Sequence, residues 1–198
     1  MLALPRSFYQ RPATEVAPEL LGKLMVHQTE LGLRIGRIVE VEAYLGRHDL
    51  AAHSSKGLTP RTRVMFGEAG HAYVYLIYGM HHCMNVVTGP PDSGSAVLLR
   101  ALEPIQGLSL NTRGPGRLAK AMGIDKRLYG ADLCSPGSTL YLADDGHTPL
   151  AVLTSPRIGV HYAGDWAEKP LRYYMGESDW VSGTRRKNPQ TQRPGKTV

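Results

Sequence analysis

"RIVEVEAYLG", residues 37–46, alternates apolar side chains with two glutamates and one tyrosine. Successive side chains of a β-strand point to opposite faces, so Val39 and Val41 share one face. By the same rule Glu42 and Tyr44 lie on the other face. The stretch therefore predicts a strand that is fixed in the hydrophobic core on one side and presents an acid and an aromatic ring on the other.

Further strands are expected around this stretch, because runs rich in β-branched and aromatic residues alternate with turn residues. The expected elements are a hairpin from residues 23–29 and 34–46, strands within residues 71–79, 81–88, 95–104, 138–144 and 155–164, and helices within residues 7–22 and 114–128. Residues 71–88 could form two strands or one bent strand.

Residues 46–71, rich in Gly, Ser, Thr, Pro and charge, predict a long functional loop. Strands with a few helices and no regular β–α alternation predict an α+β fold, a single mixed domain with a curved, mostly antiparallel sheet.

A chain of 198 residues can form one sizeable core, so we expect one domain over residues 1–184 and a disordered basic tail over residues 185–198. The N-terminus lacks a secretory signal, the longest apolar run is too short to cross a bilayer, and two distant cysteines give no disulfide framework. We expect an intracellular protein without a membrane partner, cytoplasmic in a bacterium or nuclear in a eukaryote.

The formal net charge of +6 is weak evidence for nucleic-acid binding, because most of it comes from the last sixteen residues. Local clustering is more informative. Basic residues gather without balancing acids in residues 56–63 and again in residues 113–127. These clusters could contact phosphates or could form an ordinary solvated face.

Glu42 and Arg100 are the charges that most need a partner. A carboxylate in the buried part of a strand is costly unless it is paired or used. Arg100 stands alone among apolar residues in "AVLLRALEP", so an internal pair between the two would satisfy both. Such a pair could be purely structural. For Glu40 the better prediction is an ordinary structural or surface acid.

The tyrosines of "HAYVYLIYGM" predict a second feature. Alternation places Tyr73, Tyr75 and Ile77 on one face and Tyr78 on the other. Strand tyrosines are often only good β-formers, but several beside a glycine could also form a platform on which a flat ligand stacks.

Other chemistries find less support. Glu40, Glu42, Asp49 and His53 could be proposed as a metal site, but their spacing matches no strong ligand motif. The two strand glutamates would lie side by side rather than across a sugar bond, as a two-carboxylate glycosidase requires. The sequence holds no nucleophile elbow, phosphate-binding loop or dinucleotide fingerprint. We expect no metal and no cofactor.

Several segments together resemble one family. "RIVEVEAYLGRHDLAAHS", "TPRTRVMF", "AYVYLIYGMHHCMN", "VLLRALEP", "GPGRL" and "RIGVHYAGDWAEKPLRYY" are similar to the alkyladenine (3-methyladenine, or methylpurine) DNA glycosylases. This is the vertebrate-type family, distinct from the helix-hairpin-helix glycosylases. The resemblance runs in order from about residue 7 to residue 182.

The resemblance implies a monofunctional, monomeric base-excision repair enzyme that acts on double-stranded DNA. Such an enzyme flips a damaged purine, such as 3-methyladenine, 7-methylguanine, ethenoadenine or hypoxanthine, out of the duplex and hydrolyses its N-glycosidic bond. Glu42 would be the general base that activates the water, Arg100 would hold Glu42 and the water, and the main-chain carbonyl of Val160 would contact that water. Lyase chemistry is not expected, because no lysine occupies the nucleophile position.

The resemblance also implies how DNA is held. Tyr44, His53 and Tyr75 would sandwich the flipped base, and Asn85 would crowd the 2-amino group of normal guanine. The remaining implied contacts are intercalation by Tyr78 and Met80 and backbone contacts by Thr59, Arg61, Arg117 and Lys120.

Two features separate this chain from the vertebrate pattern. His81 and His82 replace aromatics after "YGM", and the loop between His53 and Thr59 is one residue shorter. Two other functions remain as alternatives: a damage-binding module without hydrolysis, and a hydrolase of free nucleosides.

Overall fold

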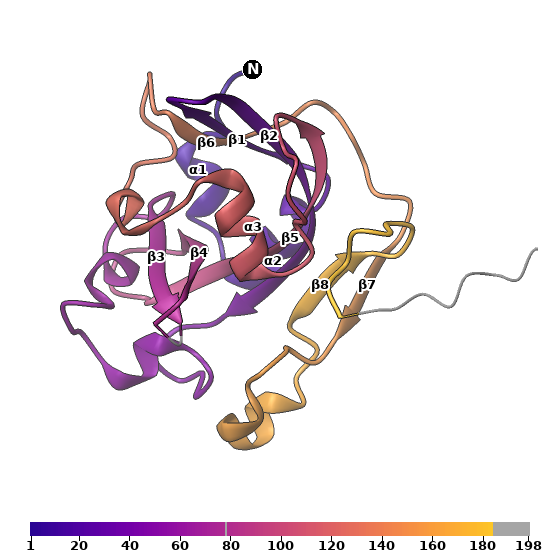
Figure 1. Cartoon of the computed structure of the whole chain (residues 1–198). Helices are drawn as coiled ribbons and strands as arrows, with labels where there is room; N and C mark the ends of the chain where they lie inside the picture. The colour runs from indigo at the N-terminus through magenta and orange to yellow at the C-terminus, as the bar shows by residue number, and fades with distance from the viewer. Residues whose placement is uncertain (78, 184–198) are drawn as a thin grey trace, which may run out of the picture.

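The sheet of this protein is antiparallel and curls around the hydrophobic core (Figure 1). The structure is a computed structural model and describes residues 1–77 and 79–183. Its strands follow the order β3-β4-β5-β2-β1-β6, and β8 pairs with both β2 and β7. The strands are β1 (Leu24–Thr29), β2 (Gly32–Tyr44), β3 (Ala72–Ile77), β4 (His81–Thr88), β5 (Ser95–Gln106), β6 (Leu140–Ala143), β7 (Val152–Ser155) and β8 (Arg172–Met175).

Short helices and 3₁₀ turns complete the fold. They are α1 (Arg6–Tyr9), α2 (Ala13–Leu20), α3 (Pro115–Met122), η1 (His53–Lys56), η2 (Arg63–Phe66), η3 (Lys126–Leu128) and η4 (His161–Ala167). Helix α2 packs on β2 and β5, and α3 packs on β4 and β5. Their apolar faces join the inner face of the sheet in one large core, which agrees with the helical spacing of their buried residues. The predicted α+β class is confirmed.

Strand β2, which contains the opening stretch, is paired on both sides. It runs antiparallel to β5 over most of its length, with irregular register between Ile38 and Val41. On its other side the first half pairs with β1, and residues 40–42 pair with β8. Strands thus pair with this part of β2 on both edges, and its side chains from residue 38 to residue 43 are buried on both faces of the sheet.

Most predicted elements are present, with two corrections. The expected strand over residues 155–164 is wrong: the strands are β7 and β8, on either side of that segment. Pro156 has no N–H to donate to a ladder, and Gly159 has a positive φ of 79°, so the segment leaves the sheet. In Figure 1 the β7–β8 hairpin, orange to yellow, extends from the side of the curled sheet.

The second correction concerns the helix expected over residues 114–128, which is shorter. Helix α3 ends at Met122 because Gly123 adopts a left-handed conformation with φ 74°. Residues 126–128 form the separate turn η3. Of the two alternatives for residues 71–88, the structure has two strands, which form the hairpin β3–β4.

Two expectations cannot be placed on the fold. The basic tail, 185–198, and the proposed wedge Tyr78 lie outside the described residues. Within residues 1–77 and 79–183, no helix has the length and apolar character needed to span a membrane.

Candidate active site

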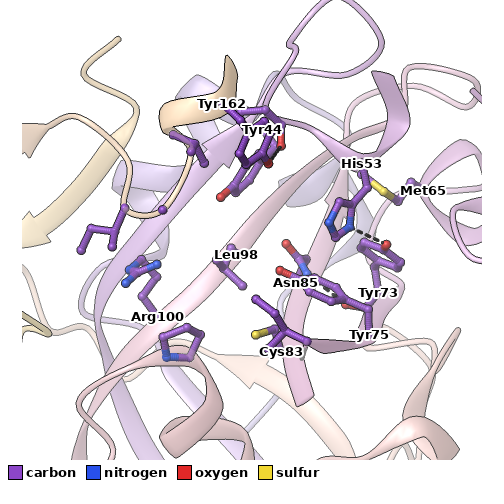
Figure 2. Close-up of a pocket in the computed structure, with 16 residues that line it drawn as sticks. Tyr44, His53, Met65, Tyr73, Tyr75, Cys83, Asn85, Leu98, Arg100 and Tyr162 are labelled. Atoms are coloured by element: carbon purple, nitrogen blue, oxygen red, sulfur yellow. Dashed lines mark hydrogen bonds between the residues drawn. The ribbon is translucent and has the colours of Figure 1, made fainter. Parts of the chain in front are cut away.

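A cavity of about 200 Å³ is lined by residues from β2, β3, β4 and β5 and from the segments that pack beside these strands. It is shown in Figure 2 with Tyr44 and Tyr162 on one side and His53, Tyr73 and Tyr75 facing them. The predicted site residues that line it are Tyr44, His53, Tyr75, Asn85, Arg100 and Val160. The fold therefore gathers side chains from positions that are far apart in the sequence.

Glu42 lies fully buried behind the cavity wall and is held by two hydrogen bonds and one ion pair. Its Oε1 accepts the backbone N–H of Ile158 at 2.7 Å and lies 3.3 Å from Nη1 of Arg100. Its Oε2 accepts the hydroxyl of Tyr44 at 2.9 Å. The predicted pair of Glu42 and Arg100 is present, and the hydroxyl of Tyr44 adds to it.

Glu40 is also fully buried, so of the two alternatives, a structural or a surface acid, the surface acid is wrong. Its Oε1 accepts from Nε of Arg100 at 3.0 Å and from Nε of Arg172 at 2.7 Å. Ser182 closes the cluster, because its N–H donates to Oε2 at 2.6 Å and its hydroxyl donates to Oε1 at 2.9 Å. The face of β2 that looked open to solvent is covered by β8 and by the segment that follows it.

Arg100 joins the two glutamates and so fixes their relative positions. Burial lowers the pKa of Arg100, but the charges of Glu42 and Glu40 outweigh this effect and raise its pKa overall. The guanidinium therefore stays charged, and its fork holds one carboxylate through Nε and the other through Nη1.

Aromatic rings form the opposite wall of the cavity. The rings of His53 and Tyr75 lie 4.6 Å apart edge to face, and those of Tyr73 and Tyr75 lie 5.3 Å apart. Burial is the main cause that raises the pKa of Tyr44 and of Tyr75 well above 10, so both hydroxyls stay protonated. Between Tyr44 and the facing rings there is room for a flat, stacked ligand.

The imidazole of His53 is held neutral. Burial, followed by the nearby charge of Arg61, lowers its pKa to about 4. Its Nδ1 lies 2.8 Å from the hydroxyl of Tyr73. A neutral imidazole has one donor and one acceptor nitrogen, which suits stacking and edge recognition better than proton donation.

We expect the ring of His53 to protonate near pH 4 rather than near its ordinary value of 6.5. Because the unfolded chain takes up this proton at the higher pH, the free energy of unfolding falls as the pH drops from 6.5 towards 4. An NMR titration of the ring resonances, assigned with His53→Gln, measures the midpoint. The same variant loses this part of the acid destabilisation, and a wild-type midpoint near 6.5 contradicts the expectation.

Asn85 and Val160 both line the cavity, and their hydrogen bonds are partly used within the protein. The Asn85 side-chain Nδ2 donates to the carbonyl of Tyr73 at 3.1 Å, which fixes the amide at the cavity. The carbonyl of Val160 accepts the N–H of Ala163 at 2.9 Å. A carbonyl oxygen has two lone pairs, so this bond leaves one for a further donor.

Of the residues predicted to contact DNA, two lie beside the cavity and three lie apart from its lining. The guanidinium of Arg61 lies 5.2 Å over the ring of Tyr75, and Arg117 lines a hollow with His81 and Pro115, a residue that also lines the cavity. The remaining three are set apart from the cavity lining: Thr59 is in a turn with Thr62, Lys120 is exposed further along α3, and Met80 is exposed in the β3–β4 turn.

Sequence reasoning missed several residues of the cavity. They are Met65, Cys83, Leu98, Pro115, Ile158 and Tyr162. Cys83 had a local signal, because it lies two residues before Asn85 on β4 and so shares its face. Ile158 had none, since its contribution to Glu42 comes from the backbone.

Among the described residues, no group of three or more His, Cys, Asp or Glu side chains is arranged to hold a metal ion.

Comparison with known proteins assigns the family. The family model described as Methylpurine-DNA glycosylase (MPG) matches residues 7–179, which is most of the chain. The chain belongs to the methylpurine-DNA glycosylase family. The resemblance read from the sequence motifs is thus confirmed, and the cavity with Glu42 and Tyr44 is the candidate active site of a member of this family.

Curated relatives from distant microbes match nearly the whole chain. A protein of Legionella pneumophila (strain Lens) is 58% identical over 185 residues, covering 93% of this chain and 100% of the relative. One of Myxococcus xanthus (strain DK1622) is 57% identical over 182 residues, covering 90% and 93%. One of Methanocella arvoryzae is 49% identical over 195 residues, covering 92% and 96%. Each carries the name "Putative 3-methyladenine DNA glycosylase".

Proposed function

We propose that this protein is a monofunctional DNA glycosylase that removes alkylated or deaminated purines from double-stranded DNA. The family and the names of its relatives support the hydrolysis of N-glycosyl bonds in DNA. One observation carries the finer proposal: a buried carboxylate, Glu42, is bonded to Tyr44, which itself forms one wall of an aromatic slot. The slot would take a flat base, and Glu42, bonded to Tyr44, would lie close to the sugar attached to that base.

The proposed reaction uses Glu42 as general base. A carboxylate has about four lone-pair positions, so the two hydrogen bonds and the Arg100 ion pair around Glu42 leave room for a water molecule. Glu42 takes a proton from this water while the oxygen of the water bonds to C1′ of the deoxyribose. The bond from C1′ to the purine nitrogen breaks, and the base leaves with the electron pair. The negative charge of Glu42 also stabilises the oxocarbenium-like sugar during this step.

The target bond is inaccessible inside a base stack, so the damaged nucleotide must first leave the duplex. Tyr44 would stack on one side of the flipped purine, with His53 and Tyr75 on the other. Asn85 would disfavour normal guanine by crowding the 2-amino group of that base. Met80, which is 72% exposed at the tip of β3–β4, supports the proposal that this turn enters the duplex together with Tyr78.

DNA affinity would come mainly from cations at the mouth of the cavity. Arg61 and Arg117 are exposed beside it, and Thr59 and Lys120 are proposed as weaker contacts. Binding should therefore weaken as salt rises, because phosphate contacts release counterions. No lysine is among the described residues that line the cavity, which supports hydrolysis without a Schiff-base lyase step.

The proposal is tested with duplexes that carry one hypoxanthine, one ethenoadenine or one 7-methylguanine, and with methylated DNA for the release of 3-methyladenine. We expect released base and abasic sites that break only after alkali, with the same rate in the presence of EDTA. Strand breaks before alkali contradict the monofunctional proposal. Binding without release on every substrate indicates a damage-binding module, and activity confined to free nucleosides indicates a nucleoside hydrolase.

A further inference from the structure

A second buried ion pair lies behind Tyr44, outside the cavity lining. Nη1 of Arg157 is 2.6 Å from Oδ2 of Asp49, and Nη2 donates to Oδ1 at 2.9 Å. Both side chains are 0% exposed. A bidentate pair of this kind fixes the orientation of both groups, because the planar guanidinium matches the carboxylate.

Asp49 holds the turn that leads from β2 into the functional loop. Its Oδ2 accepts the N–H of Leu45 at 3.0 Å, and its Oδ1 accepts the N–H of Ala51 at 3.0 Å. Ala51 lines the cavity, and His53 follows two residues later. The pair therefore ties Arg157 to the aromatic wall that contains His53.

Arg157 also contacts β2 and the segment around Trp166 directly. Its Nη1 donates to the carbonyl of Ala43 at 2.9 Å, and its Nη2 donates to the carbonyl of Trp166 at 3.2 Å. Its guanidinium lies 4.7 Å over the ring of Tyr44, on which it can exert a cation–π attraction. One side chain thus joins β2, the turn after it and the segment from residue 157 to residue 166.

The position of Arg157 in the sequence connects these contacts to the chemistry. The next residue, Ile158, donates its backbone N–H to Glu42, and the Tyr44 ring under the guanidinium donates its hydroxyl to the same carboxylate. Movement of Arg157 would therefore disturb both of the hydrogen bonds that orient Glu42. A buried ion pair is often replaceable by apolar residues without loss of stability, so its value here lies in geometry.

We propose that Arg157, with Asp49 as its partner, is a positioning residue that aligns the two hydrogen bonds by which Glu42 is aimed at the water. The inference rests on the proposed glycosylase function and adds a residue pair that does not touch the base. A 1 Å misplacement of a reacting group can lower a rate about 100-fold, which sets the scale of the expected effect.

The test compares Arg157→Lys and Asp49→Asn with wild type in single-turnover base release and in binding of the same lesion duplex. Lysine keeps the charge but cannot form the bidentate contact. We expect release to slow about 10- to 100-fold while the dissociation constant changes less than about 3-fold, since affinity comes largely from phosphate contacts. Asp145→Asn is the matched control: Asp145 forms a bidentate pair with Arg37, at 2.9 Å for each bond, away from the cavity.

A double-mutant cycle with Tyr44→Phe separates positioning from general support of the fold. Tyr44→Phe removes the hydroxyl bond to Glu42 and keeps the ring, so part of the Arg157→Lys effect should disappear in that background. Three results would overturn the inference. The first is a double variant in which the rate losses of Arg157→Lys and Tyr44→Phe multiply in full. The others are an unchanged rate in Arg157→Lys and Asp49→Asn, and equal losses of binding and release in both of these variants. Absence of release by wild type and by Asp145→Asn instead overturns the proposed function, and the inference with it.

Discussion

We expect Glu42→Gln to lose base release but still to bind damaged DNA. Glutamine keeps the shape of the side chain and can still contact Arg100, but it cannot take a proton from water or supply negative charge to the sugar. Loss of a positioned general base lowers a rate by roughly 100- to 10,000-fold. Single-turnover assays on a hypoxanthine duplex measure the release, and a gel-shift titration measures the binding.

The matched control is Glu103→Gln, which changes a glutamate on β5 outside the cavity lining. It should release base at the wild-type rate. Full activity in Glu42→Gln would end the proposed mechanism, and loss of both binding and release would indicate that the substitution disturbs the fold rather than the chemistry.

We expect Glu40→Gln to lower the free energy of unfolding more than it lowers the rate of base release. The side chain is fully buried between Arg100 and Arg172, and neutralising it leaves two guanidiniums without their shared anion. Removing one partner of a buried ion pair costs about 3–5 kcal/mol in the free energy of unfolding. For a chain of this size, a loss of 3 kcal/mol lowers the melting temperature by roughly 6–12 °C.

Thermal unfolding measures this effect, with Glu19→Gln as the control. Glu19 also pairs with an arginine, Arg11, but its side chain is 52% exposed, so its neutralisation should cost only about 0–1 kcal/mol. Below the unfolding temperature, Glu40→Gln should retain far more base release than Glu42→Gln. Equal stability of Glu40→Gln and Glu19→Gln would mean that the buried cluster relaxes without cost.

The alternation of "RIVEVEAYLG" was enough to predict which face of β2 carries Glu42 and Tyr44, because side-chain direction in a strand is a local property. The need of Arg100 for a partner was equally visible, since a lone charge in an apolar run points to a buried anion. These local signals located the core of the candidate site.

What failed depended on contacts between distant segments. The burial of Glu40 comes from Arg172 and Ser182, which are 132 and 142 positions away. Arg157 reaches Asp49 across 108 positions, and the backbone N–H of Ile158 carries no sequence signal at all. Alternation shows that a residue points to a given face, but it does not show which later segment will cover that face.

The closure of the cluster around Glu40 by Ser182 has a consequence for biosynthesis. A nascent chain that has left the ribosome only through β6 already contains Glu40, Glu42 and Arg100, yet it lacks the arginine and the serine that complete their surroundings. Until residues 172–182 emerge, Glu40 lacks these two partners. The buried cluster therefore joins Glu40 to residues that are synthesised more than 130 positions later in the chain.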